Sequence, residues 1–296
     1  MTRPVIAGVD GSPSSRRAAL WAAEEALRRN VPLRLVFAAA WPVDTEGGVT
    51  QDLFSRRATE LVAQVREEIA ARHPRLELDG VVLDDAVIAA LADASREAEL
   101  LVLGSRGIGG FRGLLVGSVA LSMAAWTEGP LALVRDAEAP TDAPLLVGVD
   151  PGRTASAVLE FAFREAELRG AGLRLVHAWS PPALWTPGPD GGAEPTAEEL
   201  DARQRLLDLV RPWRERYPGV PVQSVVRPRA ASAGLVTGSV ARVLVEEAQR
   251  AQLVVLGRRR HRAPALLHLG RTTHAVLHHA PAPVVVVPHD PAEAQP

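Results

Sequence analysis

Short apolar runs alternate with longer stretches of mixed polarity along the whole chain. Most of these runs are apolar at consecutive positions, which is typical of strands buried on both faces of a sheet. Such strands are usually parallel and covered by helices, so the pattern predicts an α/β fold. The predicted strands are Val5–Val9, Leu33–Ala38, Leu76–Leu83, Leu100–Leu103, Leu131–Val134, Leu145–Val149, Leu173–Ala178, Val222–Val226, Leu253–Leu256 and Val284–Val287.

The stretches between these runs have the spacing of amphipathic helices. Ser12 followed by Pro13 predicts the start of a first helix, because Ser is a favoured N-cap and Pro is favoured at the first helical position. Thr196 and Glu199 have the spacing of a capping box, which marks another helix start. Two matching helices each show one apolar face, formed by Ala18, Trp21, Ala22 and Ala26 and by Val158, Phe161, Ala162 and Ala166.

The pattern repeats itself, which indicates a duplicated domain. "VIAGVDGS" at Val5–Ser12 returns as "LLVGVDPG" 140 residues later, and "LLVLGSR" at Leu100–Arg106 returns as "LVVLGRR" 153 residues later. The longer second offset indicates an insertion in the second half, where Ser180–Thr196 is rich in Pro and Gly. We expect domains at residues 1–138 and 143–290, joined near Asp136–Pro144. Each is predicted to be a doubly wound, Rossmann-like sheet of five parallel strands, with its ligand at the carboxyl ends of the strands.

Two residue types are missing from the 296-residue chain, which contains neither Lys nor Cys. The absence of Lys excludes Schiff-base chemistry and the lysine of a P-loop, and the absence of Cys excludes thiol nucleophiles, thiolate metal sites and disulfides. The net charge of −2 gives no electrostatic reason to expect nucleic acid or an anionic membrane as a partner. Without a leader pattern or an apolar run of membrane-spanning length, we expect a cytoplasmic protein.

A glycine-rich stretch, "GSRGIGGFRGLLVGS" at Gly104–Ser118, stands between a predicted strand and a predicted helix. Phosphate loops in this position usually carry a lysine, but backbone N–H groups and the positive end of the following helix can bind phosphate without one. We expect Gly104 and Gly107 to adopt positive φ and to let the backbone lie close to a sugar or phosphate. Asp10 leaves the first strand at the same edge, where it can accept hydrogen bonds from a base or ribose, or can cap the first helix.

Two residues separate Gly104 from Gly107, and nine separate Gly107 from the pair Gly117 and Ser118. Together with Asp10, this spacing resembles the universal stress protein family, in its ATP-binding branch and tandem two-domain form, over essentially the whole chain. The resemblance implies an adenine nucleotide alpha hydrolase-like fold that binds ATP, with or without Mg²⁺. The contacts that it implies are Asp10 and the backbone of Ala38 at adenine, Gly8 at the floor, Gly104 and Gly107 at the ribose and α-phosphate, and Gly117, Ser118 and Val119 at the β- and γ-phosphates.

The second half matches the family pattern less well. Arg260 stands where the family has its second glycine, and Arg271 stands where it has the serine. An arginine at position 260 either fills the space of the phosphates or binds them, so nucleotide binding there stays open, and we expect one tight nucleotide per chain. The positions that do match are Gly148, Asp150, Ala178, Gly257 and Gly270.

No residue of the sequence can be assigned a catalytic role. His274 and His278 have the i, i+4 spacing that can chelate a metal on a helix, but a half-exposed helix face explains them as well, so we expect no metal site. The resemblance favours a stress-response regulatory protein whose conformation or partner choice depends on bound ATP. The alternatives are a slow ATPase and a nucleotide-independent adaptor.

Single-domain members of the resembled family form dimers through their fifth strands. This chain carries both copies, at Leu131–Val134 and Val284–Val287, and an open edge of four valines would invite aggregation. We therefore expect the two strands to pair within one chain, as a pseudo-dimer, and homodimerisation of whole chains is compatible with this arrangement. The sequence does not indicate a further protein partner.

Overall fold

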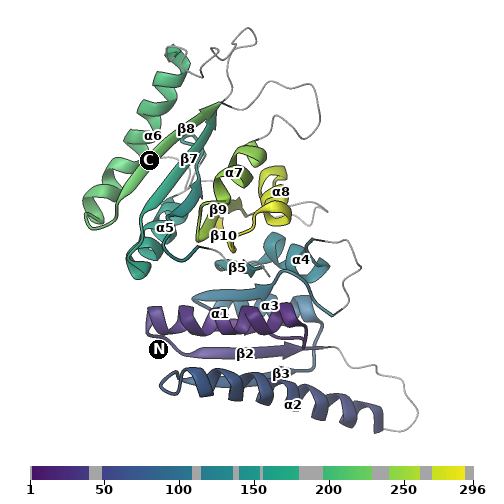
Figure 1. The fold of residues 1–296 in the computed structure, drawn as a ribbon. Helices are drawn as coiled ribbons and strands as arrows, with labels where there is room; N and C mark the ends of the chain where they lie inside the picture. The colour runs from purple at the N-terminus through teal and green to yellow at the C-terminus, as the bar shows by residue number, and fades with distance from the viewer. Residues whose placement is uncertain are drawn as a thin grey trace. The chain divides into compact units, whose positions relative to one another are not determined.

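The chain forms two compact units, each alternating strands and helices in the order that the apolar pattern predicts (Figure 1). Unit 1 is built from Met1–Glu138 and unit 2 from Ala139 onward, except for Ala265–Leu269. The structure, a computed structural model, describes residues 2–39, 49–108, 115–135, 140–153, 156–179, 196–228, 240–260 and 269–290. The predicted insertion, apart from Thr196, and part of the predicted linker lie outside these residues.

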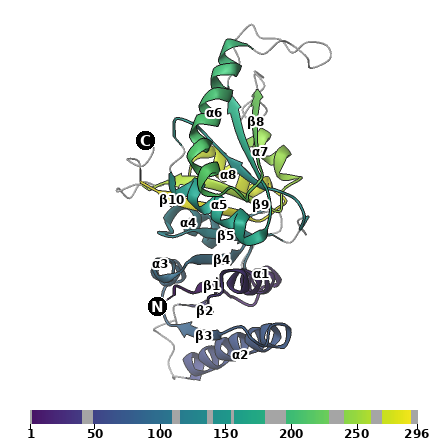
Figure 2. The same cartoon turned by 90° about the vertical axis from the view of Figure 1, so that its left-hand side faces the viewer.

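Unit 1 is a five-stranded parallel sheet with the strand order β3-β2-β1-β4-β5. Helices α1 and α2 pack on one face and α3 and α4 on the other (Figure 2). The strand order reverses between β1 and β4, which pair with each other directly. The elements are β1 Val5–Gly8, α1 Pro13–Arg29, β2 Leu33–Ala38, α2 Val49–Arg72, β3 Leu78–Leu83, α3 Val87–Glu97, β4 Leu100–Gly104, α4 Ser118–Trp126 and β5 Leu131–Val134.

Unit 2 repeats this architecture with the strand order β10-β9-β6-β7-β8, again with parallel pairing throughout. Helix α5 packs beside α6, and α7 packs beside α8. The elements are β6 Leu145–Gly148, α5 Ser156–Arg169, β7 Leu173–Trp179, α6 Ala197–Arg216, β8 Val222–Pro228, α7 Val240–Ala248, β9 Leu253–Arg259, α8 Arg271–His279 and β10 Val284–His289.

The predicted fold class, two tandem doubly wound five-stranded parallel sheets, is confirmed. Four strands of unit 2 are longer than predicted: β7 continues to Trp179, β8 to Pro228, β9 to Arg259 and β10 to His289. The apolar pattern missed the ends of β9 and β10 because they contain the polar residues Arg258 and His289, although each residue is only 5% exposed. Among the described helices, none is long and apolar enough to cross a membrane.

Both predicted helix starts are confirmed. The hydroxyl of Ser12 caps α1 by accepting a hydrogen bond from the Ser15 N–H at 3.1 Å, and Pro13 is the first helical residue. The hydroxyl of Thr196 caps α6 in the same way, with the Glu199 N–H at 3.2 Å. These caps satisfy donors that a helix cannot pair internally.

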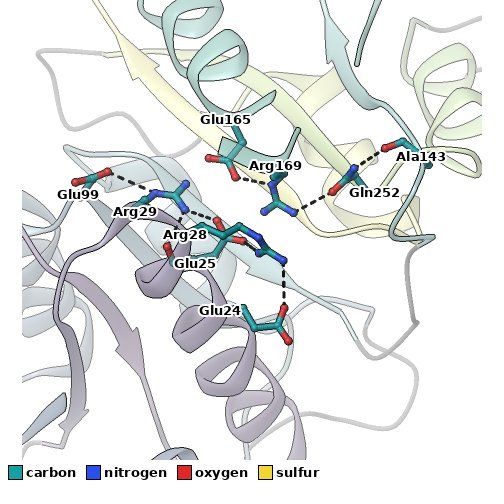
Figure 3. Close-up of polar contacts among 9 residues, drawn as sticks. All are labelled: Glu24, Glu25, Arg28, Arg29, Glu99, Ala143, Glu165, Arg169 and Gln252. Carbon is teal, nitrogen blue, oxygen red and sulfur yellow. Dashed lines mark hydrogen bonds and ion pairs between the residues drawn. The ribbon is translucent and has the colours of Figure 1, made fainter. Parts of the chain in front are cut away.

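Unit 1 buries a charged cluster at the C-terminal end of α1 (Figure 3). Glu25 is 0% exposed and forms ion pairs with Arg28 and Arg29. Arg29, whose side chain is 3% exposed, also lies 3.5 Å from Glu99. Arg28 also lies 3.5 Å from the more exposed Glu24, so three carboxylates and two guanidinium groups meet at this place.

Unit 2 has a smaller version of this cluster at the end of α5 (Figure 3). The Arg169 Nε lies 2.6 Å from Glu165, and the two side chains are 6% and 2% exposed. Arg169 also donates a hydrogen bond to Gln252 at 3.1 Å, and the Gln252 amide donates to the carbonyl of Ala143. The neutral Gln252 therefore joins the ion pair to the segment that precedes β6.

The two clusters differ by a compensated exchange of charge. Leu168 stands where unit 1 has Arg28, 140 residues earlier, and Gln252 stands where unit 1 has Glu99, 153 residues earlier. At these two positions unit 2 thus lacks one positive and one negative charge at once. This compensation matters because an unpaired buried charge is strongly destabilising.

We expect Glu165→Ala to lower the free energy of unfolding by about 3 kcal/mol, because it leaves the Arg169 charge buried without its carboxylate. Arg242 and Glu246 provide a matched control, since they form an i, i+4 pair of similar length, 2.7 Å, with side chains 56% and 62% exposed. Glu246→Ala should cost less than about 0.5 kcal/mol. Chemical denaturation of the full chain measures both values, and equal losses would show that burial does not decide the strength of the pair.

Candidate functional site

The carboxyl ends of β1 and β4 lie side by side in the middle of the unit 1 sheet. The two strands pair directly and end at Gly8 and Gly104. Each strand is followed by a turn and then by a helix, so two helix N-termini lie at this edge of the sheet. In doubly wound sheets this is where ligands bind.

Asp10 connects the turn after β1 to the turn after β4. Its Oδ1 accepts a hydrogen bond from the Ser12 N–H at 2.9 Å, and its Oδ2 accepts one from the Ile108 N–H at 3.1 Å. The N-cap of α1 is Ser12 and not Asp10, so the capping alternative for Asp10 is wrong. The carboxylate instead holds the glycine-rich turn against β1, and its contact with adenine stays a prediction.

Gly104 and Gly107 lie where the two turns approach each other most closely. A Cβ at Gly104 would lie 2.7 Å from the carbonyl carbon of Ser14, and a Cβ at Gly107 would lie 2.5 Å from Oδ2 of Asp10. The expectation of positive φ is wrong for both, since the described glycines with positive φ are Gly11 and Gly170. Glycine is required in this turn for space and not for a left-handed backbone.

The glycine-rich turn closes at the N-terminus of α4. The Gly117 N–H donates to the carbonyl of Ser105 at 2.8 Å, and Gly117 is the N-cap of the helix that begins at Ser118. A Cβ at Gly117 would meet its nearest neighbours at 3.7 Å, which is ordinary contact. Ser118 is exposed and Val119 is half-buried, and the first N–H groups of a helix have no acceptor within it, so this end can bind an anion.

Gly8 and Ala38 complete the residues that the resemblance implies for unit 1. A Cβ at Gly8 would lie 2.5 Å from the Leu103 side chain, so packing alone already requires glycine there. Ala38 is the half-buried last residue of β2 and lies at the same edge of the sheet. All of the implied residues of unit 1 thus lie at one edge, while residues 109–114 of the glycine-rich turn lie outside the described residues.

The matching edge of unit 2 keeps some of these features. Gly148 packs like Gly8, since a Cβ there would lie 2.7 Å from the Leu256 side chain. Asp150 accepts a hydrogen bond from the Gly152 N–H at 3.2 Å, as Asp10 does from the matching residue. The Oδ2 of Asp150 lies 3.8 Å from the guanidinium of Arg153. In unit 1, Oδ2 of Asp10 instead accepts the hydrogen bond from the Ile108 N–H in the turn after β4.

Strand β9 continues at the point where β4 ends. β4 ends at Gly104, but β9 runs past the matching Gly257 and pairs with β10 as far as His289. The Arg260 N–H then donates to the carbonyl of His289 at 2.8 Å, and the Arg260 guanidinium lies 3.5 Å from Asp290. The backbone therefore extends along β10 in unit 2, whereas in unit 1 it turns back onto α1.

Arginines occupy the place of the glycine-rich turn in unit 2. Burial, followed by the charge of Arg260, lowers the pKa of Arg258 to about 10, so this side chain is still cationic at neutral pH. Gly270 is the N-cap of α8, with nothing within 4 Å of an added Cβ, and the exposed Arg271 is the first helical residue. The other two matching residues keep their places, Ala178 on β7 and Gly257 on β9.

Two serines of the first turn of α1 also contact the glycine-rich turn, and the sequence analysis missed these contacts. The Ser12 hydroxyl donates to the carbonyl of Arg106 at 3.3 Å. The Ser14 hydroxyl accepts a hydrogen bond from the Arg106 N–H at 3.4 Å. The sequence assigned Ser12 to helix capping alone and gave Ser14 no role. The available signal was the stretch "DGSPS", which places two serines directly after Asp10 and Gly11.

The two histidines of α8 lie together, with the ring centroids of His274 and His278 4.5 Å apart. Within the described part of the chain, no group of three or more His, Cys, Asp or Glu side chains is arranged to hold a metal ion.

Comparison with known proteins links the chain to one family. The family model described as "Universal stress protein family" matches residues 1–135 and again residues 143–288. A universal stress protein of Mycobacterium tuberculosis is 35% identical over 320 residues, covering 97% of this chain and 96% of the relative. A second one from the same organism is 35% identical over 295 residues, covering 95% and 96%.

Solved structures show the same fold at lower identity. A universal stress protein from Archaeoglobus fulgidus DSM 4304 has a TM-score of 0.69 and 17% identity, covering 97% of this chain and 99% of the other. A putative universal stress protein from Pseudomonas aeruginosa UCBPP-PA14 has a TM-score of 0.57 and 15% identity, with 97% and 93% covered. The arrangement of elements is thus shared far more widely than the sequence.

We expect Gly104→Ala to destabilise unit 1 by about 2 kcal/mol, because the added methyl group would meet rigid backbone atoms of α1. Gly117→Ala should cost less, about 0.5 to 1 kcal/mol, because the methyl group makes ordinary contacts and only the weaker N-cap preference of Ala is lost. Denaturant unfolding of both variants checks this difference. A Gly104→Ala protein as stable as Gly117→Ala would contradict the close approach of the turn to α1.

Proposed function

We propose that this chain, which belongs to the universal stress protein family, is a cytoplasmic regulatory protein that binds one molecule of ATP in unit 1. The observation that carries the proposal is the path of the turn after β4, which contacts the first turn of α1 and leads into the N-terminus of α4. Backbone N–H groups in such a turn can bind phosphate oxygens without a lysine. This suits a chain that contains no lysine.

The surroundings of Gly117 support a phosphate at the start of α4. An added Cβ would find only ordinary contacts there, and Ser118 next to it is exposed, so an anion can approach the backbone closely. Mg²⁺, when it accompanies ATP, neutralises part of the triphosphate charge. The proposed contacts are Asp10 and Ala38 at adenine, Gly8 at the floor, Gly104 and Gly107 at the ribose and α-phosphate, and Gly117, Ser118 and Val119 at the β- and γ-phosphates.

Unit 2 is proposed not to bind a nucleotide in this way. The backbone after Gly257 extends along β10 and places Arg260 beside Asp290, so the N–H groups of a folded-back turn are not offered at this edge. Within the described residues, Asp150 lies 3.8 Å from the guanidinium of Arg153. The proposal therefore assigns one nucleotide to each chain.

Intramolecular pairing of β5 with β10 is the proposed reason why both copies reside in one chain. Each of these strands is the terminal strand of its own sheet order, and an open edge strand is prone to pair. Solution scattering of the full chain tests the pairing. A paired chain should have a radius of gyration of about 20 Å, near the value for one compact body, whereas two separated units would exceed about 25 Å.

We expect calorimetry to find one ATP per chain and Gly117→Val to weaken its binding at least about tenfold, or 1.4 kcal/mol. The β-branched side chain would cover the N–H groups at the start of α4. Gly270→Val is the matched control, because Gly270 is the equivalent N-cap in unit 2 and has open space around it. This control should leave the affinity unchanged.

Unchanged affinity in Gly117→Val, or two equivalent sites per chain, would contradict the proposal. Mass spectrometry of small molecules released from the purified protein identifies the nucleotide directly. A chain that carries and binds no nucleotide would instead be an adaptor. If the chain releases ADP from ATP, and a variant changed at both Gly117 and Ser118 does not, the chain is an ATPase.

A further inference from the structure

The turn between β1 and α1 holds the turn after β4 at three points. Asp10 accepts a hydrogen bond from the Ile108 N–H at 3.1 Å. Ser12 and Ser14 bond the carbonyl and the N–H of Arg106, at 3.3 and 3.4 Å respectively. Both backbone polar groups of Arg106 are thus bound by hydroxyls that lie more than ninety residues away in the sequence.

Ser12 and Ser14 are placed to support the turn after β4 rather than to contact a ligand themselves. Ser12 and Ser14 are each 5% exposed, so their hydroxyls meet the protein interior rather than solvent. The Ser12 hydroxyl serves two purposes, because it accepts from the Ser15 N–H at 3.1 Å as the cap of α1 while it donates to Arg106. The Ser14 hydroxyl can be removed without removing that cap.

Unit 2 offers an internal comparison. Gly152 stands where unit 1 has Ser12, so no side-chain hydroxyl is available there. Thr154, which matches Ser14, keeps a hydroxyl, so the difference between the units concerns Ser12. In unit 2 the described backbone from Gly257 to Arg259 pairs along β10, so the Ser12 hydroxyl is lost in the unit whose strand is extended.

We propose that Ser12 and Ser14 are positioning residues for the nucleotide site, acting through the backbone of Arg106. They fix the turn after β4, which leads to the start of α4, where the first helical N–H groups can bind phosphate. A turn held in its binding form loses less conformational entropy when the ligand arrives. The inference rests on the proposed function, and its effect falls on the phosphates and not on the base.

Ser14→Ala tests the proposal with Ser15→Ala as the matched control. Ser15 is also 5% exposed, and its hydroxyl bonds only within the turn after β1, to the Ser12 carbonyl at 3.0 Å and the Asp10 N–H at 3.3 Å. Calorimetry of the full chain should show that Ser14→Ala weakens ATP binding about fivefold, the typical effect of one hydrogen bond. Adenosine binding should change less than about twofold, since adenosine carries no phosphate.

An unchanged ratio of ATP to adenosine affinity in Ser14→Ala would overturn the proposal. So would a ratio that falls equally in Ser15→Ala, because that result would assign the effect to the helix start and not to the turn. Ser14→Thr, which keeps the hydroxyl, should retain most of the wild-type ratio.

Amide hydrogen exchange of the nucleotide-free protein gives a second readout that does not depend on ATP. Exchange at the Arg106 N–H should rise about fivefold in Ser14→Ala and stay unchanged in Ser15→Ala. Unchanged exchange at Arg106 would show that the serine does not hold the turn. If the wild-type chain binds no nucleotide, the proposed function fails, and this exchange still decides whether the serines fix the turn.

Discussion

The close approach of the turn after β4 to the first turn of α1 is the constraint on which the site of unit 1 depends. At Gly104 the two backbones leave no room for a methyl group, since a Cβ would lie 2.7 Å from the backbone of Ser14. This approach is possible because β1 and β4 are neighbours in the sheet, so the turns that follow them leave the sheet at one edge. The turn then leads into α4, whose first N–H groups have no acceptor within the helix and can bind an anion.

The two units share one fold but differ at the edge of the sheet where the candidate site of unit 1 lies. Both units have five parallel strands in the equivalent order, and each keeps a buried Glu–Arg pair at the end of its first helix although Arg28 and Glu99 are replaced by Leu168 and Gln252. Those exchanges compensate each other. At the edge of the candidate site, by contrast, arginines replace small residues, Arg260 lies beside Asp290, and the strand extends further along β10.

Much of the fold could be predicted from the sequence, because consecutive apolar residues mark strands that are covered on both faces. The buried ends of β9 and β10 could not, since Arg258 and His289 interrupt the apolar pattern although the sheet continues through them. The helical periodicity likewise missed Glu25, which is buried because Arg28 and Arg29 neutralise it. Such charged and polar residues are buried because folding gives them a partner or a neighbouring strand, and the apolar pattern of the sequence carries no information about those contacts.

The sequence predicted which residues share one edge of the sheet but not how they contact one another. Glycine spacing and Asp10 pointed to the edge where the turns after β1 and β4 meet, yet the reason for Gly104 and Gly107 is lack of space and not positive φ. The serine contacts depend on two turns that meet only after folding, so the sequence showed them solely as a pair of small polar residues after a strand.

The central claim is that one folded-back turn, in unit 1, binds the phosphates of ATP. The most direct test is an ATP titration of the whole isotope-labelled chain, followed through the NMR shifts of assigned backbone amides. We expect the largest shifts at Gly104–Ile108 and Gly117–Val119, with no comparable change at Gly257–Arg260 or Gly270. Equal or larger shifts in the unit 2 segments, or shifts that miss the turn of unit 1 altogether, would contradict the claim.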